Sequence, residues 1–231
     1  MGRMSVLAFV AAERRELEGI LNRASSQGTL RWPVEFAREF VLNGQAAIAV
    51  ANGPGPKLAG FALDAVRERR EIRGVVSVGY CGALKPELDA SDIAVATRVN
   101  NRGARAPEVS RTFAAGPVVS ADRVVTSAEE KSGLARTGAI AVEMEAEALA
   151  ERAESWGVPF YCVRVVTDTA GETLPLDFNA LRDADGRFRR SRIVLAAMRH
   201  PGVLVPRLLK LDRRCREASV LLGDFIADCR F

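Results

Sequence analysis

Histidine, metal-binding cysteine patterns and long apolar runs are scarce or missing in this sequence of 231 residues. The one histidine, His200, precedes Pro201 in a basic stretch (RHPG), which nearly excludes catalysis by a Ser-His-Asp or Cys-His pair. Carboxylates are therefore the expected acids and bases. The four cysteines are scattered without a C-x-x-C motif, so we expect no metal site and a reducing, cytoplasmic setting. No apolar run approaches the ~20 residues that a membrane span needs.

The charge of the chain is unevenly distributed. Its 33 Lys+Arg and 29 Asp+Glu give a net charge of +4, but residues 178–231 alone carry 12 basic and 6 acidic residues. The apolar fraction of 48% is enough for a full core. We therefore expect residues 1–231 to form a single domain that ends in a basic helical extension of about 178–231.

Continuous apolar runs alternate with helical patterns along the core. Continuous rather than alternating apolarity is typical of strands buried on both faces. The expected strands are 6–10, 47–51, 75–78, 93–96 and 160–166, and the expected helices are 13–23, 57–70 and 144–156. This order predicts a three-layer α/β/α sandwich, with a mixed and partly barrel-like central sheet and helices added at the C-terminal end.

An apolar stripe runs along the C-terminal segment at alternating steps of four and three residues. Its members are Leu204, Leu208, Leu211, Cys215, Ala218, Leu222 and Phe225. Arginines and a lysine oppose the stripe. The pattern favours a helix docked on its own domain, with a dimer contact or a membrane-surface helix as alternatives. Nucleic acid is not an expected partner, because the basic segment lacks aromatic residues for base stacking.

Two glycine-rich turns follow expected strands. They read NGPGPKLA (Asn52–Ala59) and GYCGAL (Gly79–Leu84). Neither is a dinucleotide fingerprint or a Walker loop. Such turns, at Gly53 and Gly79, nevertheless expose backbone N–H groups to an anion or a hydroxylated ligand.

Acidic residues mark the strand ends in the segment 139–172 (AIAVEMEAEALAERAESWGVPFYCVRVVTDTAGE). Glu143 and Glu145 follow one strand and Asp168 ends the next. Carboxylates at the ends of buried strands cost free energy unless they are paired or bind a ligand. With VEMEA and VVTD, the chain resembles the nucleoside phosphorylase/nucleosidase superfamily, and methylthioadenosine/S-adenosylhomocysteine nucleosidases most closely. The resemblance extends through SVLAFVAAERREL, NGPGPKLA, VVSVGYCGALKPELDASDIAVA and SADRVV, in that order, over roughly residues 4–172.

The resemblance implies cleavage of the N-ribosidic bond of a purine nucleoside without a metal or organic cofactor. Asp168 would be the general acid that protonates N7 of the leaving base. Glu145 would hold the ribose hydroxyls and offset the oxocarbenium charge, with Met144 against the sugar. Val124 and Val125 would sandwich the base.

Other positions are less clearly assigned by the resemblance. Either Glu13 or Glu16 would activate the attacking water, and we prefer Glu13 because it follows the strand directly. Glu143, Gly53, Gly79 and Tyr80 are further expected binding residues.

Arg164 is expected either to orient an acidic neighbour or to form a structural ion pair. Tyr80 replaces a small hydroxyl residue of the family, and Ser77 replaces the phosphate-binding arginine of hexameric purine phosphorylases. Hydrolysis and phosphorolysis, with phosphate as co-substrate, both stay open. A nucleoside-binding protein without catalysis is the alternative from another class.

The C-terminal quarter resembles the tail of hopanoid-associated phosphorylases, which release adenine from adenosylhopane. This resemblance implies a lipid-linked adenosine as substrate and a membrane-surface contact through the basic C-terminal helix. Family members are dimers or hexamers, and we expect a homodimer.

Overall fold

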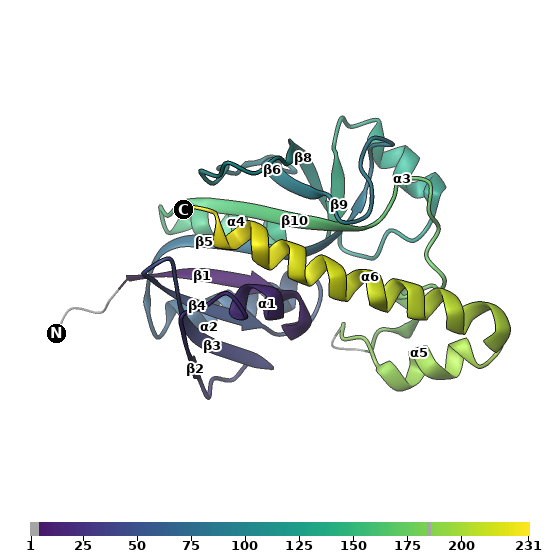
Figure 1. Ribbon diagram of the computed structural model, residues 1–231, viewed down its shortest axis with the longest axis horizontal. Helices are drawn as coiled ribbons and strands as arrows, with labels where there is room; N and C mark the ends of the chain where they lie inside the picture. The colour runs from purple at the N-terminus through teal and green to yellow at the C-terminus, as the bar shows by residue number, and fades with distance from the viewer. Residues whose placement is uncertain (1–4, 184–185) are drawn as a thin grey trace.

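The computed structural model describes residues 5–183 and 186–231 (Figure 1). Its strands are β1 (Ser5–Ala11), β2 (Ser26–Thr29), β3 (Phe36–Leu42), β4 (Gln45–Ala51), β5 (Glu71–Ala83), β6 (Ile93–Val99), β7 (Arg102–Gly103), β8 (Ala114–Ser120), β9 (Ala141–Glu143) and β10 (Phe160–Asp168). Its helices are α1 (Arg14–Leu21), α2 (Pro56–Arg67), α3 (Ala128–Ala135), α4 (Ala146–Ser155), α5 (Arg190–Ala197) and α6 (Pro201–Ala227), with a 3₁₀ turn at Asn179–Leu181.

The strands form one mixed sheet that closes on itself at one end. The strand order is β10-β6-β8-β9-β5-β1-β4-β3-β2, and β7 pairs with β6. Because β10 also pairs with β5, strands β5, β10, β6, β8 and β9 form a closed ring. The length of β5 allows this closure: residues 71–77 pair with β1, residues 75–82 with β10 and residues 82–83 with β9. The parallel strands β5 and β10 therefore end at the same edge.

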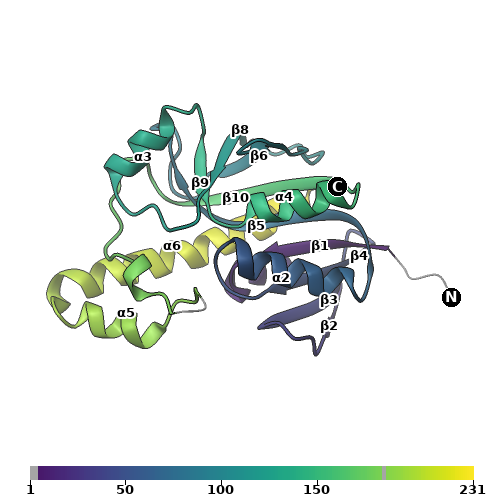
Figure 2. The same cartoon turned by 180° about the vertical axis from the view of Figure 1, so that it is seen from behind.

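Helices cover both faces of the open part of the sheet. On one face, Ala8 of β1 packs in a cluster that contains Leu63 of α2 and residues of α4 (Figure 2). On the other face, Phe9 packs with Ile20 of α1 and Phe225 of α6, the helices in front in Figure 1. Alternate side chains of β1 thus enter opposite cores, which explains why its sequence is continuously apolar.

Two glycines bring α1 and α6 into backbone contact. A Cβ on Gly19 would lie 1.8 Å from the carbonyl oxygen of Ser219, and a Cβ on Gly223 would lie 2.2 Å from the carbonyl carbon of Gly19. The Ser219 hydroxyl donates to the carbonyl oxygen of Arg15 at 2.7 Å and accepts from the Gly19 N–H at 3.1 Å. The C-terminal half of α6 therefore fixes α1, whose first turn reaches the site described below.

The predicted fold class is confirmed, with some elements missed. The five expected strands lie within β1, β4, β5, β6 and β10, and the three expected helices correspond to α1, α2 and α4. Strands β2, β3, β7 and β8 and helix α3 were not predicted, whereas β9 corresponds to the strand expected before Glu145. In α6, Cys215, Ala218, Leu222 and Phe225 of the apolar stripe are buried, so this half of the helix docks on its own chain. The first half of α6 extends with α5 beyond the sheet (Figure 1).

Candidate active site

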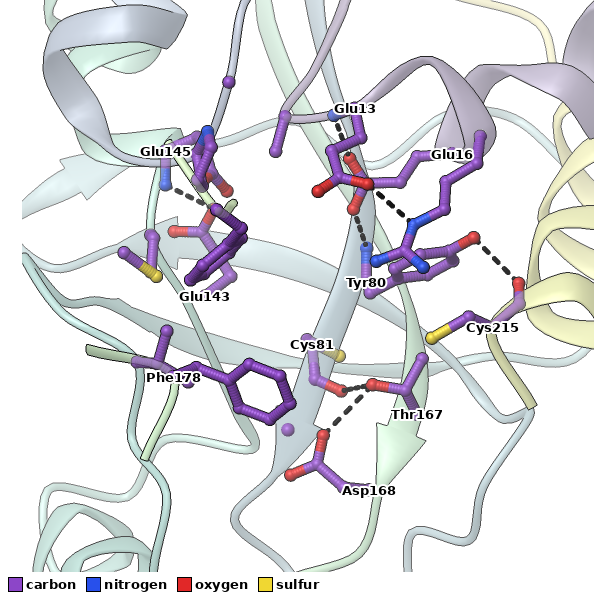
Figure 3. Close-up of a pocket in the computed structure, with 18 of the residues that line it drawn as sticks. Glu13, Glu16, Tyr80, Cys81, Glu143, Glu145, Thr167, Asp168, Phe178 and Cys215 are labelled. Atoms are coloured by element: carbon purple, nitrogen blue, oxygen red, sulfur yellow. Dashed lines mark hydrogen bonds and ion pairs between the residues drawn. The ribbon is translucent and has the colours of Figure 1, made fainter. Parts of the chain in front are cut away.

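A cavity of about 790 Å³ lies where β5 and β10 end. The start of α1, the turn from β9 to α4 and the segment before α5 complete its wall. Figure 3 shows Glu145, Glu16 and Asp168 on three sides of this space. All three carboxylates are largely buried, with 6 or 7% exposure. Buried carboxylates that share a cavity are the groups expected to carry chemistry in this molecule.

Glu145 is held by backbone and charge at the start of α4. Its Oε1 accepts a hydrogen bond of 2.8 Å from the N–H of Gly55, and Nη2 of Arg164 lies 4.0 Å from its Oε2. Burial and then the charge of Glu143 raise the pKa of Glu145 to about 7, and Arg164 opposes this shift. Glu145 keeps acceptor capacity on Oε2, which suits it to bind ligand hydroxyl groups.

Arg164 and Glu143 fix the position of Glu145. The guanidinium of Arg164 is buried, forms an ion pair with Glu143 and donates to Oγ of Ser77 at 2.6 Å. The Glu143 carboxylate also accepts from the N–H groups of Glu145 at 3.0 Å and Ala146 at 2.9 Å. These contacts occupy Glu143, so its role is to fix the first turn of α4 and the position of Glu145.

Glu16 reaches the cavity because a glycine leaves room for it. Its Oε2 accepts from the N–H of Glu13 at 2.9 Å, and its Oε1 accepts from the N–H of Tyr80 at 3.1 Å. Gly79 has a φ of +144°, and a Cβ there would lie 2.8 Å from Oε1 of Glu16 and 2.7 Å from Nη1 of Arg164. Burial raises the pKa of Glu16 above its ordinary value.

Glu13 lies at the rim and Tyr80 forms part of the wall. The Glu13 carboxylate is partly exposed and pairs with Nε of Arg15 at 2.8 Å. The Tyr80 hydroxyl donates to the carbonyl oxygen of Cys215 in α6 at 2.7 Å, and the Arg15 guanidinium lies over its ring. The phenol of Tyr80 thus links the end of β5 to α6.

Asp168 ends β10 and has partners on both carboxyl oxygens. Oδ1 accepts from Oγ1 of Thr167 at 3.0 Å, and Oδ2 forms an ion pair with the buried Lys131 of α3. Burial raises the pKa of Asp168, whereas the charge of Lys131 and hydrogen bonds lower it; the net direction is upward. A raised pKa favours the protonated form that a general acid needs.

A family model described as the phosphorylase superfamily matches residues 101–199. The 5'-methylthioadenosine/S-adenosylhomocysteine nucleosidase of Marinomonas sp. is 25% identical over 169 residues, which cover 58% of this chain and 73% of that protein. The protein of the same name from Chromohalobacter salexigens is 23% identical, covering 77% and 90%.

Solved structures agree in fold. The nucleosidase of the same name from Neisseria meningitidis, in complex with methylthio-immucillin-A, has a TM-score of 0.70 at 18% identity and covers 97% of this chain and 98% of its own. The futalosine hydrolase of Helicobacter pylori has a TM-score of 0.71 at 16% identity, covering 97% and 96%. The resemblance to the phosphorylase superfamily is confirmed. The resemblance of the tail to hopanoid-associated phosphorylases stays a prediction.

The structure gathers most of the residues selected from the superfamily motifs. Ten of them line the cavity: Glu13, Glu16, Gly53, Tyr80, Val124, Val125, Glu143, Met144, Glu145 and Asp168. Gly79 and Arg164 are not among the described lining residues. Gly79 leaves room for Glu16, and Arg164 contacts Glu143 and Glu145, so both residues affect the cavity through side chains that line it.

Several residues of the site were not anticipated from the sequence. Lys131 is fully buried against Asp168, although its helix reads as a charged surface segment. Phe178 and Phe188 form an edge-to-face pair, with ring centroids 6.0 Å apart, in the cavity wall. Ile193 and Leu211 add to this wall from α5 and α6. These apolar residues come from the extension, whose resemblance to hopanoid-associated phosphorylases assigned no individual site residue.

Across residues 5–183 and 186–231, no group of three or more His, Cys, Asp and Glu side chains is arranged to hold a metal ion. The expectation of a reaction without cofactor stays a prediction. Within the same ranges, no helix has the length and apolarity to cross a membrane.

Proposed function

We propose that this protein is an enzyme that cleaves the N-ribosidic bond of a 5'-substituted adenosine. The observation that carries the proposal is the convergence of three buried carboxylates, Glu16, Glu145 and Asp168, on one cavity of about 790 Å³. This cavity lies within a fold shared with solved nucleosidases. Its size lies within the range of ordinary small-ligand sites.

The three carboxylates would divide the chemistry of C1'–N9 cleavage. Asp168 donates a proton to N7 of adenine, so that the bonding pair departs onto a neutral base. Glu145, as a carboxylate, accepts hydrogen bonds from the ribose hydroxyls and stabilises the positive charge on the sugar. The raised pKa of Asp168 and the retained negative charge of Glu145 above its pKa of about 7 suit these different tasks.

Glu16 is the carboxylate that we propose as the base, in place of the preferred Glu13. Both line the cavity, but only Glu16 is buried, with its carboxylate beside the N–H of Tyr80. Burial raises the pKa of Glu16, which makes it a stronger base toward a bound water. Glu13 pairs with Arg15 at the rim and keeps a supporting role through its own N–H.

Hydrolysis is the displacement that this site favours over phosphorolysis. Each of the four arginines among the described lining residues pairs with a carboxylate: Arg14 with Glu18, Arg15 with Glu13, Arg123 with Glu130 and Arg187 with Glu35. A phosphate dianion would have to displace these partners and approach the buried carboxylate of Glu16. Water meets neither obstacle.

Adenine release from 5'-methylthioadenosine, followed with and without phosphate, tests this assignment. We expect equal rates in both buffers and free 5-methylthioribose as the second product. Glu16→Gln should lower kcat by about 10²–10⁴, as loss of a general base does, and Glu68→Gln, at an ion-paired surface position outside the cavity lining, is the control. Strict phosphate dependence would show a phosphorylase. Binding of adenosine analogues without any release of adenine would favour the nucleoside-binding alternative.

The 5'-group would face an apolar wall. Five apolar side chains of residues 174–211 line the cavity: Leu174, Phe178, Phe188, Ile193 and Leu211. This wall supports a substrate with an apolar 5'-substituent, and a lipid-linked adenosine such as adenosylhopane is the extreme member of that class. The wall belongs to the same extension whose sequence resembles hopanoid-associated phosphorylases.

Helix α5 and the first half of α6, which we call the α5–α6 hairpin, expose Val194, Leu195, Met198, Val203 and Leu209 by 60% or more. Exposed arginines accompany them, which supports contact with an anionic membrane surface. The superfamily resemblance supports a homodimer, and the four unpaired, buried cysteines support a reducing, cytoplasmic setting.

A further inference from the structure

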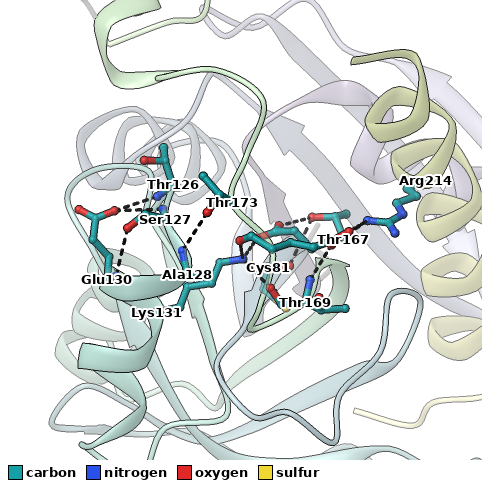
Figure 4. Close-up of polar contacts among 12 residues, drawn as sticks. Cys81, Thr126, Ser127, Ala128, Glu130, Lys131, Thr167, Thr169, Thr173 and Arg214 are labelled. Atoms are coloured by element: carbon teal, nitrogen blue, oxygen red, sulfur yellow. Dashed lines mark hydrogen bonds and ion pairs between the residues drawn. The ribbon is translucent and has the colours of Figure 1, made fainter. Parts of the chain in front are cut away.

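Lys131 is a fully buried lysine in the fourth position after the N-cap of α3. The helix start is rigid: the Ser127 hydroxyl accepts from the N–H of Glu130 at 3.1 Å, and the Glu130 carboxylate accepts from the N–H of Thr126 at 3.1 Å (Figure 4). A buried ammonium is costly unless strong partners replace its water. The burial of Lys131 therefore indicates that specific acceptors compensate its charge.

The ammonium of Lys131 donates all three of its hydrogens to acceptors at the end of β10 and in the segment that follows it. It pairs with Oδ2 of Asp168 and donates to the carbonyl oxygens of Thr169 at 2.7 Å and Glu172 at 3.1 Å. The Glu172 carboxylate in turn accepts from the Thr169 N–H and from Arg214 of α6. Lys131 is thus fixed from both sides, and Figure 4 shows it between α3 and the segment that follows β10.

This contact makes the two oxygens of Asp168 unequal. Oδ2 faces an ammonium, so a proton on Asp168 belongs on Oδ1. The neighbour of Oδ1 is the hydroxyl of Thr167, which has a second acceptor in the carbonyl oxygen of Cys81 at 3.3 Å. Thr167 can therefore donate to Oδ1 when Asp168 is ionised and to Cys81 when Asp168 carries the proton.

We propose that Lys131 is the positioning residue of the general acid: it holds Oδ2 so that Asp168 presents its proton from Oδ1, and it compensates the carboxylate formed after transfer. The inference rests on the proposed function. The proton moves from Oδ1 to N7 of adenine, the C1'–N9 pair departs onto the base, and Asp168 stays behind as an ion pair with Lys131.

Electrostatics around Asp168 accord with this arrangement. Burial raises the pKa of Asp168 and Lys131 lowers it. The other ionisable groups facing this region come from the post-β10 segment, from β5 and from α6: Glu172, Cys81, Cys215 and Arg214. Among these influences Lys131 is the largest that favours ionisation. Its removal should therefore move the pKa of Asp168 further upward.

The test compares pH profiles of adenine release by the wild type, Lys131→Met and Asp168→Asn. We expect Lys131→Met to lower kcat at pH 7 by about ten- to a hundredfold with KM changed less than threefold, and to move the alkaline limb of kcat to higher pH. In the Asp168→Asn background the same substitution should change kcat less than twofold. Glu130→Gln is the matched control, because it weakens the start of α3 without touching Asp168; it should lower thermal stability and leave the alkaline limb in place.

Either of two results overturns the proposal: an unmoved alkaline limb in Lys131→Met, or an equal loss of kcat in both backgrounds. A second measurement needs neither turnover nor a folded variant. In the wild type, the ¹⁵Nζ chemical shift of Lys131 should change as the ¹³C carboxyl signal of Asp168 reports ionisation of that carboxyl; a Lys131 signal that does not respond to Asp168 also rejects the pairing. A wild type that releases no adenine but shows this response would disprove the proposed function alone.

Discussion

At the scale of single residues, the site contains more buried carboxylates than buried cations near Glu145. Glu143 and Arg164 form a buried ion pair, and both groups make further hydrogen bonds, to backbone N–H groups and to Ser77 respectively. Glu145 lies just outside this pair, with Arg164 at 4.0 Å, and it is left with a pKa of about 7. The molecule thus keeps one carboxylate destabilised, and destabilised groups are common where a ligand completes the network.

Glu145→Gln should therefore lower the activity of the protein and raise its stability. We expect kcat/KM for 5'-methylthioadenosine to fall by about 10²–10³, because a charge that stabilises the sugar cation is lost. A carboxyl whose pKa is raised on folding contributes stability at pH below its unfolded pKa, and this contribution is lost as pH rises through the folded pKa. The variant should match the wild type near pH 4.5 and exceed it above pH 7, by up to about 3 kcal/mol.

Urea unfolding at pH 5 and pH 8 measures this difference. Glu129→Gln, at an exposed position of α3, is the control and should show no such pH dependence. A stability difference that stays constant between the two pH values would contradict the raised pKa of Glu145.

The residues predicted from sequence were those with a local signature. Glu145 and Asp168 follow buried strands, where an acid is unexpected without a partner. Lys131 had no such signature, because a lysine in AEEKSGLA is typical of a solvated helix; its burial arises from residues 169–172 folding over it. The choice between Glu13 and Glu16 depended on how the chain bends at the start of α1, which spacing alone does not give.

At the scale of elements, local apolar runs identify the core strands but not the closure of the sheet. β8 (AAGPVVS) contains glycine and proline, so it does not resemble a strand in isolation. β9, the strand expected before Glu145, has only three residues, and its sequence does not show which strands it pairs with. Both are needed to close the ring between β6 and β5. Long-range pairing supplies this information, and it places Glu143 at the end of β9, opposite Arg164.

Gly223→Ala should loosen the contact that fixes α1 and the first turn bearing Glu16. The new Cβ would lie 2.2 Å from the backbone of Gly19, so α6 must shift. We expect a loss of about 1–3 kcal/mol of stability, as for other overpacked contacts, and a lower kcat through displacement of Glu16. Thermal unfolding and adenine release measure both effects.

The matched control is Gly133→Ala in α3. The nearest side-chain atom to its new Cβ is Nη2 of Arg136 at 3.7 Å, so this change should be neutral or slightly stabilising. Equal behaviour of the two variants would show that α1 and α6 do not depend on close backbone contact.

At the scale of the whole molecule, the extension both closes the cavity and carries the exposed apolar surface. Ile193 and Leu211 face the cavity, while Leu195 and Met198 of the α5–α6 hairpin are exposed by 69% and 60%. In Figure 1 the hairpin projects beyond the sheet, away from the β1–β4 region. The division into a core and a basic extension, predicted from charge and from the extent of the family resemblance, stays a prediction as a statement about domains. The hairpin nevertheless joins the apolar wall of the cavity to an exposed apolar surface, whose contact with water is unfavourable.

The proposed membrane contact can be measured with vesicles of phosphatidylcholine containing 30% phosphatidylserine. The wild type should co-sediment with these vesicles, and binding should weaken in high salt because arginines such as Arg199 contribute. The double substitution Leu195→Glu and Met198→Glu should weaken binding tenfold or more, since it removes ~1.5–3 kcal/mol of apolar burial per side chain. Phe61→Glu, at a 49% exposed position of α2, is the control and should bind like the wild type. Equal binding by all three proteins, or none by the wild type, would leave the hairpin as a wall of the cavity alone and restrict the substrate to nucleosides that reach it through water.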